Sequence, residues 1–283
     1  MDKVILINKP KGYTSRDVVN AVCRKFNTKR VGHFGTLDPL ASGLLVIGIG
    51  ALTKLGNFSL FDDKVYRAEV LMGVSTDTYD VTGSVVSRSG YASSDAILSC
   101  LNSFVGTYDQ EVPIYSAVKV NGRKLYDYAR SGEFVTLPSK SVTIHSIYDV
   151  SFYERDGLKY FSFCCSVSKG TYIRSLINDI GNKLGVCLCM SNLERISQGS
   201  FSLSDACNLS DLDSGNYKLF DVCDIFSPLV MEVPSSLYNS VMNGGIIPKI
   251  SDKYILFVKS GVYLFMYGPY KSGMKPYLTF KND

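Results

Sequence analysis

An aspartate placed directly before a proline is the first candidate for chemistry in this chain of 283 residues. Asp38 lies in the stretch GHFGTLDPLASG, residues 32–43. Pro39 disfavours helical backbone at Asp38, and Gly35 and Gly43 permit turns that other residues resist. The carboxylate is therefore expected on a loop, where a substrate can reach it. An Asp-Pro turn that merely joins two strands is the alternative that this stretch leaves open.

Two further carboxylates, Asp77 and Asp80, lie close together in the stretch TDTYD. Aspartates in such stretches accept hydrogen bonds from nearby backbone amides, which favours a role in organising the loop. Either one could also pair with Asp38 for glycoside hydrolysis, a reaction whose outcome depends on the separation of two carboxyl groups. The sequence does not fix that separation, so this alternative stays open.

Positive charge is concentrated before the Asp38 stretch, although the formal net charge of the whole chain is only +4. The first 31 residues carry eight lysines and arginines against two aspartates. Such a run is usually a solvated face, but this one leads directly to the candidate carboxylate and would attract phosphates. The charge distribution therefore favours nucleic acid as a partner.

Composition argues against several other classes of protein. The chain is 46% hydrophobic, and its length suits one large domain and a smaller one. The eight cysteines form no CxxC pair and there are two histidines, His33 and His145, so no zinc site of familiar spacing is expected. The stretch LASGLLVIGIGAL is too short to span a bilayer, and the N-terminus lacks a signal-peptide pattern. We expect a cytoplasmic protein.

The elements that must position these residues are both strands and helices. VILIN near the N-terminus has the character of a strand, and GYTSRD opens a helix in which Thr14 and Asp17 are placed as a capping box. KVYRAEVLMGV favours a strand, and VTIHSIYDVSFYE with LKYFSFCCSVS an antiparallel pair. GTYIRSLINDIG predicts a helix with Arg174 in its first turn. The pattern predicts a mixed α/β domain over residues 1–229.

The pattern of residue types changes after about residue 229. Short aromatic strands such as YILFVK, VYLFMYG and YLTF follow, separated by glycine and proline turns. Lysines and tyrosines interleave there, a combination that suits RNA phosphates and bases, although core packing explains many of the aromatic residues equally well. We predict a separate small β domain at residues 230–283.

A family resemblance is carried by seven stretches that follow one another along the chain. They are NKPKGYTS, GHFGTLDPLASGLL, KVYRAEV, GVSTDTYDVTG, PIYSAVKVNGRKLYDYAR, GTYIRSL and LERISQGSF. Together they strongly resemble the TruB family of tRNA pseudouridine-55 synthases over roughly residues 4–201. The tail from about residue 230 loosely resembles the family's PUA domain, an RNA-binding β barrel. Val112 departs from the family pattern, in which a proline is common at this position.

The resemblance implies a fold and three catalytic residues. The fold is a mixed, largely antiparallel sheet flanked by helices. Asp38 matches the family's catalytic nucleophile, Arg174 matches the arginine that pairs with it, and Tyr66 matches the tyrosine that stacks on the target uracil. Without the resemblance, a surface ion pair and a core tyrosine would account for Arg174 and Tyr66.

Five further residues match family positions at the RNA or in the base pocket. His33 corresponds to a histidine beside the RNA, and Lys9 and Pro10 belong to a KPxG segment near the active site. Tyr172 and Leu193 match residues that line the pocket, although a core tyrosine and leucine would look the same in the sequence.

The reaction implied by the resemblance is the isomerisation of a uridine in the tRNA T loop. The bond from uracil N1 to C1′ breaks, the base turns, and a bond from C5 to C1′ forms, so no cofactor or metal is expected. The carboxylate could attack C6, attack C1′, or act as a base that forms a glycal, and the sequence leaves these routes open. The expected partner is the T arm of tRNA, with no membrane, no required protein partner and a monomeric chain.

A protein that binds or folds tRNA without catalysis is the nearest alternative. The basic N-terminal segment and the β tail would suit it equally well. The presence of Asp38, Tyr66 and Arg174 together favours an enzyme.

Overall fold

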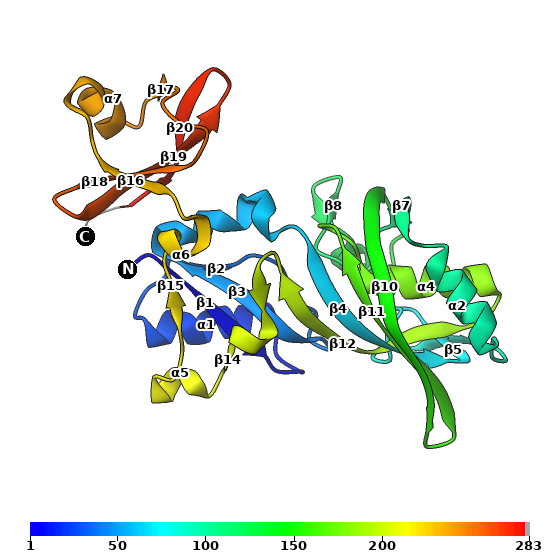
Figure 1. Ribbon diagram of the computed structural model, residues 1–283. Coiled ribbons are helices and arrows are strands. Elements are labelled where there is room, and N and C mark those ends of the chain that lie inside the picture. Colours follow the sequence, from blue (N-terminus) through cyan, green and yellow to red (C-terminus); the bar gives the residue numbers. More distant parts are fainter. Residues whose placement is uncertain (281–283) are drawn as a thin grey trace.

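An 11-stranded sheet runs through the first 220 residues of the computed structural model, which describes residues 1–280 (Figure 1). The order of its main strands is β14-β1-β3-β12-β4-β11-β10-β7, while β2, β13 and β15 pair at the side of this path. The strands are β1 Lys3–Lys9, β2 Val31–His33, β3 Ser42–Ile49, β4 Lys64–Met72, β7 Gly106–Glu111, β10 Ser139–Arg155, β11 Leu158–Val167, β12 Leu188–Gln198, β13 Phe201–Ser202, β14 Cys207–Asn208 and β15 Leu219–Phe220.

Most neighbouring strands of this sheet are antiparallel, while β1 with β14 and β3 with β12 are parallel. The long pair predicted from VTIHSIYDVSFYE and LKYFSFCCSVS is present as β10 and β11. The prediction of a mixed, largely antiparallel sheet is therefore confirmed. Two small hairpins lie outside the sheet, β5 Val74–Thr76 with β6 Val85–Arg88, and β8 Lys119–Val120 with β9 Arg123–Lys124.

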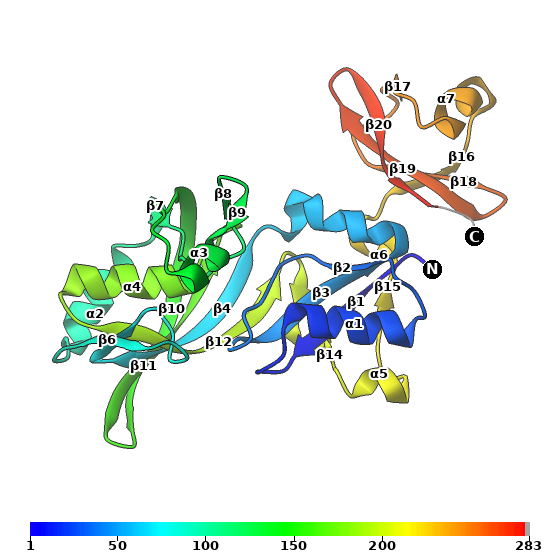
Figure 2. The same ribbon diagram turned by 180° about the vertical axis from the view of Figure 1, so that it is seen from behind.

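Helices flank the sheet on both of its halves (Figure 2). They are α1 Ser15–Lys25, α2 Ser94–Asn102, α3 Leu125–Ser131, α4 Ile173–Leu184, α5 Asp211–Ser214, α6 Val222–Phe226 and α7 Tyr238–Met242, with short 3-10 helices η1 Gly50–Asn57, η2 Ser59–Phe61, η3 Leu203–Asp205 and η4 Ser235–Leu237. The predicted capping box of Thr14 and Asp17 begins α1. No helix among residues 1–280 is both long and apolar enough to cross a membrane.

The two halves of the sheet have separate cores and meet at β3 and β12. One core lies between α1 and the strands β1 and β3, and includes Val18, Ile5 and Leu45. The other lies among β4, β11, β12, α2 and α4, and includes Phe163 and Ile177. Strands β3 and β12 pair in parallel only where residues 42–43 meet residues 194–195. Side chains from both halves can therefore converge beside this junction.

The C-terminal segment forms a second sheet of five strands that curls into a half-barrel (Figure 1). Its order is β16-β18-β19-β20-β17, with bounds β16 Leu229–Glu232, β17 Ile247–Pro248, β18 Ile255–Lys259, β19 Val262–Tyr270 and β20 Gly273–Thr279. Residues 281–283, the last of the segment predicted as a β domain, lie outside the described residues.

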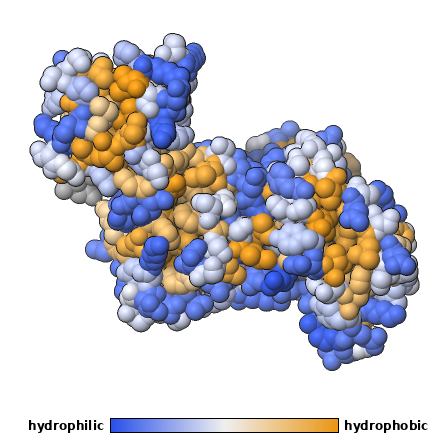
Figure 3. Space-filling view, viewed as in Figure 1, coloured by the Kyte–Doolittle hydropathy of each residue, from blue (hydrophilic) through white to orange (hydrophobic). Residues whose placement is uncertain are grey.

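Apolar packing joins this second sheet to the large one. The half-barrel has a core of its own around Phe257 and Tyr267. The Tyr267 ring is therefore buried in the interior of the half-barrel and does not face solvent. On its other face, Leu256 and Leu278 share a cluster with Phe34 and Leu55 of the large domain. Figure 3 shows further hydrophobic residues gathered on the surface of this C-terminal lobe.

Candidate active site

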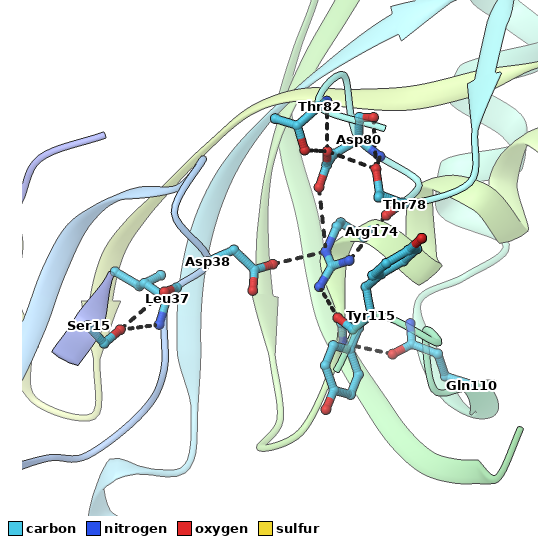
Figure 4. Close-up of polar contacts among 10 residues, drawn as sticks. Ser15, Leu37, Asp38, Thr78, Asp80, Thr82, Gln110, Tyr115 and Arg174 are labelled. Carbon is cyan, nitrogen blue, oxygen red and sulfur yellow. Dashed lines mark hydrogen bonds and ion pairs between the residues drawn. The ribbon is translucent and has the colours of Figure 1, made fainter. Parts of the chain in front are cut away.

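Asp38 lies on the loop between β2 and β3, as the Asp-Pro stretch predicts (Figure 4). Its carboxylate side chain is 39% exposed. The loop turns at this residue, where the Asp38 carbonyl accepts a hydrogen bond from Ala41 N at 3.0 Å. On the other side of the turn, Gly12 N donates to the Pro39 carbonyl at 2.7 Å. A carboxylate on a loop held at both ends of its turn has a defined direction.

Arg174 is the direct partner of Asp38. It is the second residue of α4, and its side chain is 6% exposed. Its Nε donates to Asp38 Oδ2 at 2.9 Å, Nη1 to the Thr78 carbonyl at 3.1 Å and Nη2 to the Tyr115 carbonyl at 3.0 Å (Figure 4). Because all three nitrogens are engaged, the guanidinium plane is fixed and the charge is aimed at the carboxylate.

Asp80 contributes a second carboxylate to the same guanidinium. As expected for a loop organiser, its Oδ1 accepts hydrogen bonds from Thr82 N at 2.9 Å and from Thr78 Oγ1 at 3.0 Å. Its Oδ2 lies 4.0 Å from Arg174 Nε, and the Asp80 side chain is 8% exposed. Sequence reasoning missed this electrostatic contact, because nothing in TDTYD identifies a cation 94 residues further along the chain.

Asp38 borders a cavity of about 280 Å³ whose lining includes Tyr66, Tyr172, Arg174 and Leu193. The structure thus brings together these five residues predicted from the family resemblance. Tyr66 comes from β4 and is 7% exposed. Burial, assisted by the nearby charge of Asp38, raises the pKa of Tyr172, so its phenol stays neutral at neutral pH. The cavity can take a planar ring beside the carboxylate.

Gln110 positions the start of α4 and was not predicted. Its Oε1 accepts a hydrogen bond from Tyr172 N at 2.7 Å, at the N-cap of the helix that carries Arg174 (Figure 4). Its Nε2 donates to Tyr108 Oη at 2.7 Å, and Gln110 is 1% exposed. A glutamine side chain in β7 therefore takes the place of a local cap, and the 62 residues that separate the partners leave no sequence signal.

The remaining predicted residues lie outside this cavity. Lys9 is fully buried, and its Nζ donates to the carbonyls of Pro10 at 3.1 Å and Tyr13 at 2.6 Å. Burial lowers the pKa of Lys9 to about 8. Lys9 and Pro10 border a separate groove of about 1070 Å³ beside α1. These contacts hold the turn after β1 and leave the Lys9 ammonium turned away from solvent.

His33 ends β2, five residues before Asp38. Burial, together with the charges of Arg195 and Arg16, lowers its pKa, so the imidazole is neutral at neutral pH. Its buried Nδ1 has no hydrogen-bond partner within residues 1–280. A neutral imidazole is a poor proton donor, and the unpartnered nitrogen is too deeply buried to reach a bound molecule.

Chemically, the site offers a partly exposed carboxylate, a fixed cation and an aromatic cavity. No cluster of three or more metal-ligating side chains occurs among the described residues. Arg174 Nε lies 2.9 Å from one Asp38 oxygen and 4.0 Å from one Asp80 oxygen, so each carboxylate faces the same cation and neither stands apart as the general acid that glycoside hydrolysis requires. Nucleophilic or basic catalysis by Asp38 on a ring held in the cavity fits the arrangement best.

Comparisons with known proteins agree on one family. A family model described as TruB family pseudouridylate synthase (N terminal domain) matches residues 23–173. The chain is 46% identical over 215 residues to tRNA pseudouridine synthase B of Clostridium kluyveri, covering 76% of this chain and 73% of that protein. It is also 46% identical over 214 residues to tRNA pseudouridine synthase B of Clostridium perfringens, covering 75% of this chain and 72% of that one.

A solved structure shares the fold at low sequence identity. It is an H/ACA RNP bound to a substrate RNA containing 2′-deoxyuridine, with a TM-score of 0.65 and 20% identity. The match covers 99% of this chain and 85% of that chain. The likeness therefore extends over the large sheet and the C-terminal half-barrel together.

Proposed function

The chain belongs to the TruB family of pseudouridylate synthases and is an RNA pseudouridine synthase, and from this premise we propose that it converts uridine 55 in the T loop of tRNA to pseudouridine with Asp38 as the catalytic nucleophile. The contact between Arg174 Nε and Asp38 Oδ2, at the mouth of an aromatic cavity, is the observation that carries this proposal. A carboxylate paired with a fixed cation at this position supports attack on a base that enters the cavity.

The proposed reaction requires a directed carboxylate and a pocket that holds the uracil. In the course of it the bond from N1 to C1′ breaks, a bond from C5 to C1′ forms, C5 loses its proton and N1 gains one. Whether the carboxylate attacks C6, attacks C1′ or removes a proton to form a glycal, it must be held in one direction, and the hydrogen bond from Arg174 Nε provides that. We assign Tyr66 to stacking on the uracil, and Tyr172 and Leu193 to the walls of its pocket.

Flipping the uridine costs a few kcal/mol, which stacking in the cavity must offset. A folded loop that already displays its bases lowers this cost and presents phosphates in a fixed pattern. We therefore assign recognition to the shape of the T arm, with the exposed basic residues of the N-terminal segment as phosphate contacts. Lys9 is left out of this set because its ammonium is buried.

An isolated, folded T arm should remain a substrate, with kcat/KM within about tenfold of full tRNA, whereas a linear strand of the loop sequence should be at least about 100-fold poorer. The measurement compares kcat/KM on the three RNAs at one fixed salt concentration, because affinity for nucleic acid depends steeply on salt. Equal values for the folded arm and the linear strand would refute recognition by shape.

Replacing Asp80 by Asn should lower kcat about tenfold, equal to about 1.4 kcal/mol in the barrier, with little change in KM. The amide keeps an acceptor for Thr82 N but removes the charge that faces Arg174. Steady-state kinetics on a tRNA transcript measure the effect. Asp77→Asn is the matched control, since Asp77 accepts from Ser84 N at 2.8 Å in the same turn and should stay within about threefold of wild type. Equal losses in both variants would indicate a general disturbance of the turn.

The C-terminal half-barrel, residues 230–283 in our proposed division, is assigned to RNA affinity. At its β19–β20 turn, Lys275 Nζ lies 4.1 Å from the ring centroid of Tyr270 and 5.1 Å from that of Tyr277. Lysines and aromatic rings side by side suit phosphates and unstacked bases. Deleting the segment would uncover the cluster that it shares with the large domain, so point variants are the sounder test.

The double variant Lys271→Ala, Lys275→Ala should raise KM for tRNA several-fold, leave kcat unchanged, and reduce the slope of log affinity against log salt by about one to two. Lys259→Ala is the control, because Lys259 lies over Tyr238 in the same way but at the opposite end of β19. A fall in kcat at saturating tRNA would mean that the half-barrel helps to assemble the active site.

A further inference from the structure

Two side chains that were not matched to a functional position of the family, Arg195 and Ser15, bind the backbone of the segment that carries Asp38. We propose that Arg195 and Ser15 are positioning residues that clamp the backbone of residues 34–44 and so hold the Asp38 carboxylate at the angle the reaction needs. The inference rests on the proposed function of Asp38, and it concerns residues that do not touch the substrate cavity.

All three nitrogens of the Arg195 guanidinium donate hydrogen bonds to the backbone of this segment. Nε donates to the Leu44 carbonyl at 2.7 Å, Nη2 to the Gly35 carbonyl at 3.0 Å, and Nη1 to the Thr36 carbonyl at 3.3 Å. Three nitrogens thus bind carbonyls on both sides of Asp38, two at the start of the loop and one in β3 just after it. Because the guanidinium is planar and its donors point in fixed directions, its position determines where the bound carbonyls lie.

Arg195 is also fully buried, and within residues 1–280 the hydrogen bonds of its guanidinium go to backbone carbonyls and not to a carboxylate. A buried cation without a counter-ion is costly for stability unless its hydrogen bonds are satisfied. Here neutral carbonyls alone satisfy it. An apolar side chain of similar size would serve the core with less cost, so the residue is better explained by what it does to the loop than by stability.

Two glycines allow the loop to lie against this side chain. A Cβ at Gly35 would come within 3.3 Å of both Arg195 Nη1 and Lys64 Cε. Gly43 has a φ of +101°, and a Cβ there would overlap the Arg195 backbone where β3 and β12 pair. The glycines that bracket Asp38 in the sequence therefore serve close approach to Arg195, and at Gly43 an unusual backbone angle as well.

Ser15 holds the same loop from a different element, helix α1. Its Oγ accepts a hydrogen bond from Leu37 N at 2.9 Å and donates to the Leu37 carbonyl at 3.1 Å (Figure 4). Ser15 is 4% exposed and is the first residue of α1. Leu37 immediately precedes Asp38, so the two bonds fix the peptide units on both sides of Leu37, the second of which leads directly into Asp38. The clamp thus joins α1, the Asp38 loop and β12.

The test uses the full chain with Arg195→Lys and Ser15→Ala, assayed on a tRNA transcript. Lysine keeps the charge, but its single nitrogen cannot bind three separated carbonyls. Alanine is tolerated at the start of α1, since the capping box of Thr14 and Asp17 remains. Because a misplacement of about 1 Å can cost 100-fold in rate, we expect kcat to fall about 10- to 100-fold in Arg195→Lys and about 3- to 10-fold in Ser15→Ala.

Two further readouts separate positioning from general damage to the fold. The dissociation constant for tRNA should stay within about threefold of wild type, and amide hydrogen exchange should become faster in the peptide that spans residues 34–44 and remain unchanged elsewhere. Ser15→Ala keeps the proposal testable if Arg195→Lys fails to fold. Arg155→Lys and Ser103→Ala are matched controls far from the loop, where Arg155 binds Glu69 and Ser103 binds the Cys100 carbonyl, and they should stay within twofold in kcat.

Wild-type kcat in both variants, or a loss of affinity and of rate together with faster exchange throughout the chain, would overturn the clamp. An inactive wild-type protein would contradict the proposed function instead, and loop exchange in the variants would still test whether Arg195 and Ser15 hold the loop.

Discussion

Replacing Asp38 by Asn should abolish pseudouridine formation, with a loss of at least about 10⁴-fold in kcat, the scale seen when a covalent catalyst loses its nucleophile. The amide has the same shape but neither the charge nor the nucleophilicity of the carboxylate. Because the Asp38 side chain is partly exposed, the fold and the affinity for tRNA should be nearly unchanged. Release of tritium from C5-labelled uridine measures the rate, and filter binding measures the affinity.

Asp221→Asn is the matched control for this substitution. Asp221 also forms an ion pair, with Lys3 at 3.5 Å, and it caps α6, a position at which asparagine is equally suitable. Its activity should equal that of wild type. Turnover by Asp38→Asn in a preparation free of wild-type enzyme would remove Asp38 from the mechanism. Full affinity with no turnover would separate an enzyme from a protein that only binds or folds tRNA.

Replacing Arg174 by Lys should lower kcat about 100-fold while changing KM little. Lysine keeps a positive charge near Asp38, but it cannot also bind the carbonyls of Thr78 and Tyr115, and these bonds fix the direction of the guanidinium. The partner charge would then be mobile, and the carboxylate would lose its orientation. Single-turnover rates at saturating tRNA measure the chemical step directly.

Arg155→Lys serves again as the control, since Arg155 ends β10 and its guanidinium binds Glu69 of β4 at 3.0 Å. It should show wild-type rates. If Arg174→Lys lost affinity and rate in equal proportion, the arginine would be a phosphate contact and not the partner of the nucleophile.

Local patterns predicted the elements that depend on near neighbours in the chain. The capping box of Thr14 and Asp17, the loop that carries Asp38 and the β10–β11 pair all follow from spacing within a few residues. The grouping of Asp38 with Arg174, Tyr66, Tyr172 and Leu193 came from the family resemblance, because these residues belong to four separate elements. Their shared cavity agrees with that grouping.

The features that the sequence did not predict all depend on distant partners or on burial. Gln110 caps α4 from 62 residues away, and Arg195 binds carbonyls that lie 151 or more residues before it. Lys9 belongs to a run of basic residues typical of a solvated face, yet it is buried and its ammonium donates hydrogen bonds to carbonyls of its own turn. Such polar contacts leave no periodicity, and they become visible only when the strands are in register.

The most direct test of the central claim follows tritium from C5-labelled uridine in a tRNA transcript, combined with mapping of the modified position. We expect one tritium released per tRNA by the wild-type protein, pseudouridine at position 55 alone, no free base or sugar, and no release when uridine 55 is replaced by cytidine. Release that survives the cytidine replacement, or a free base among the products, would contradict it.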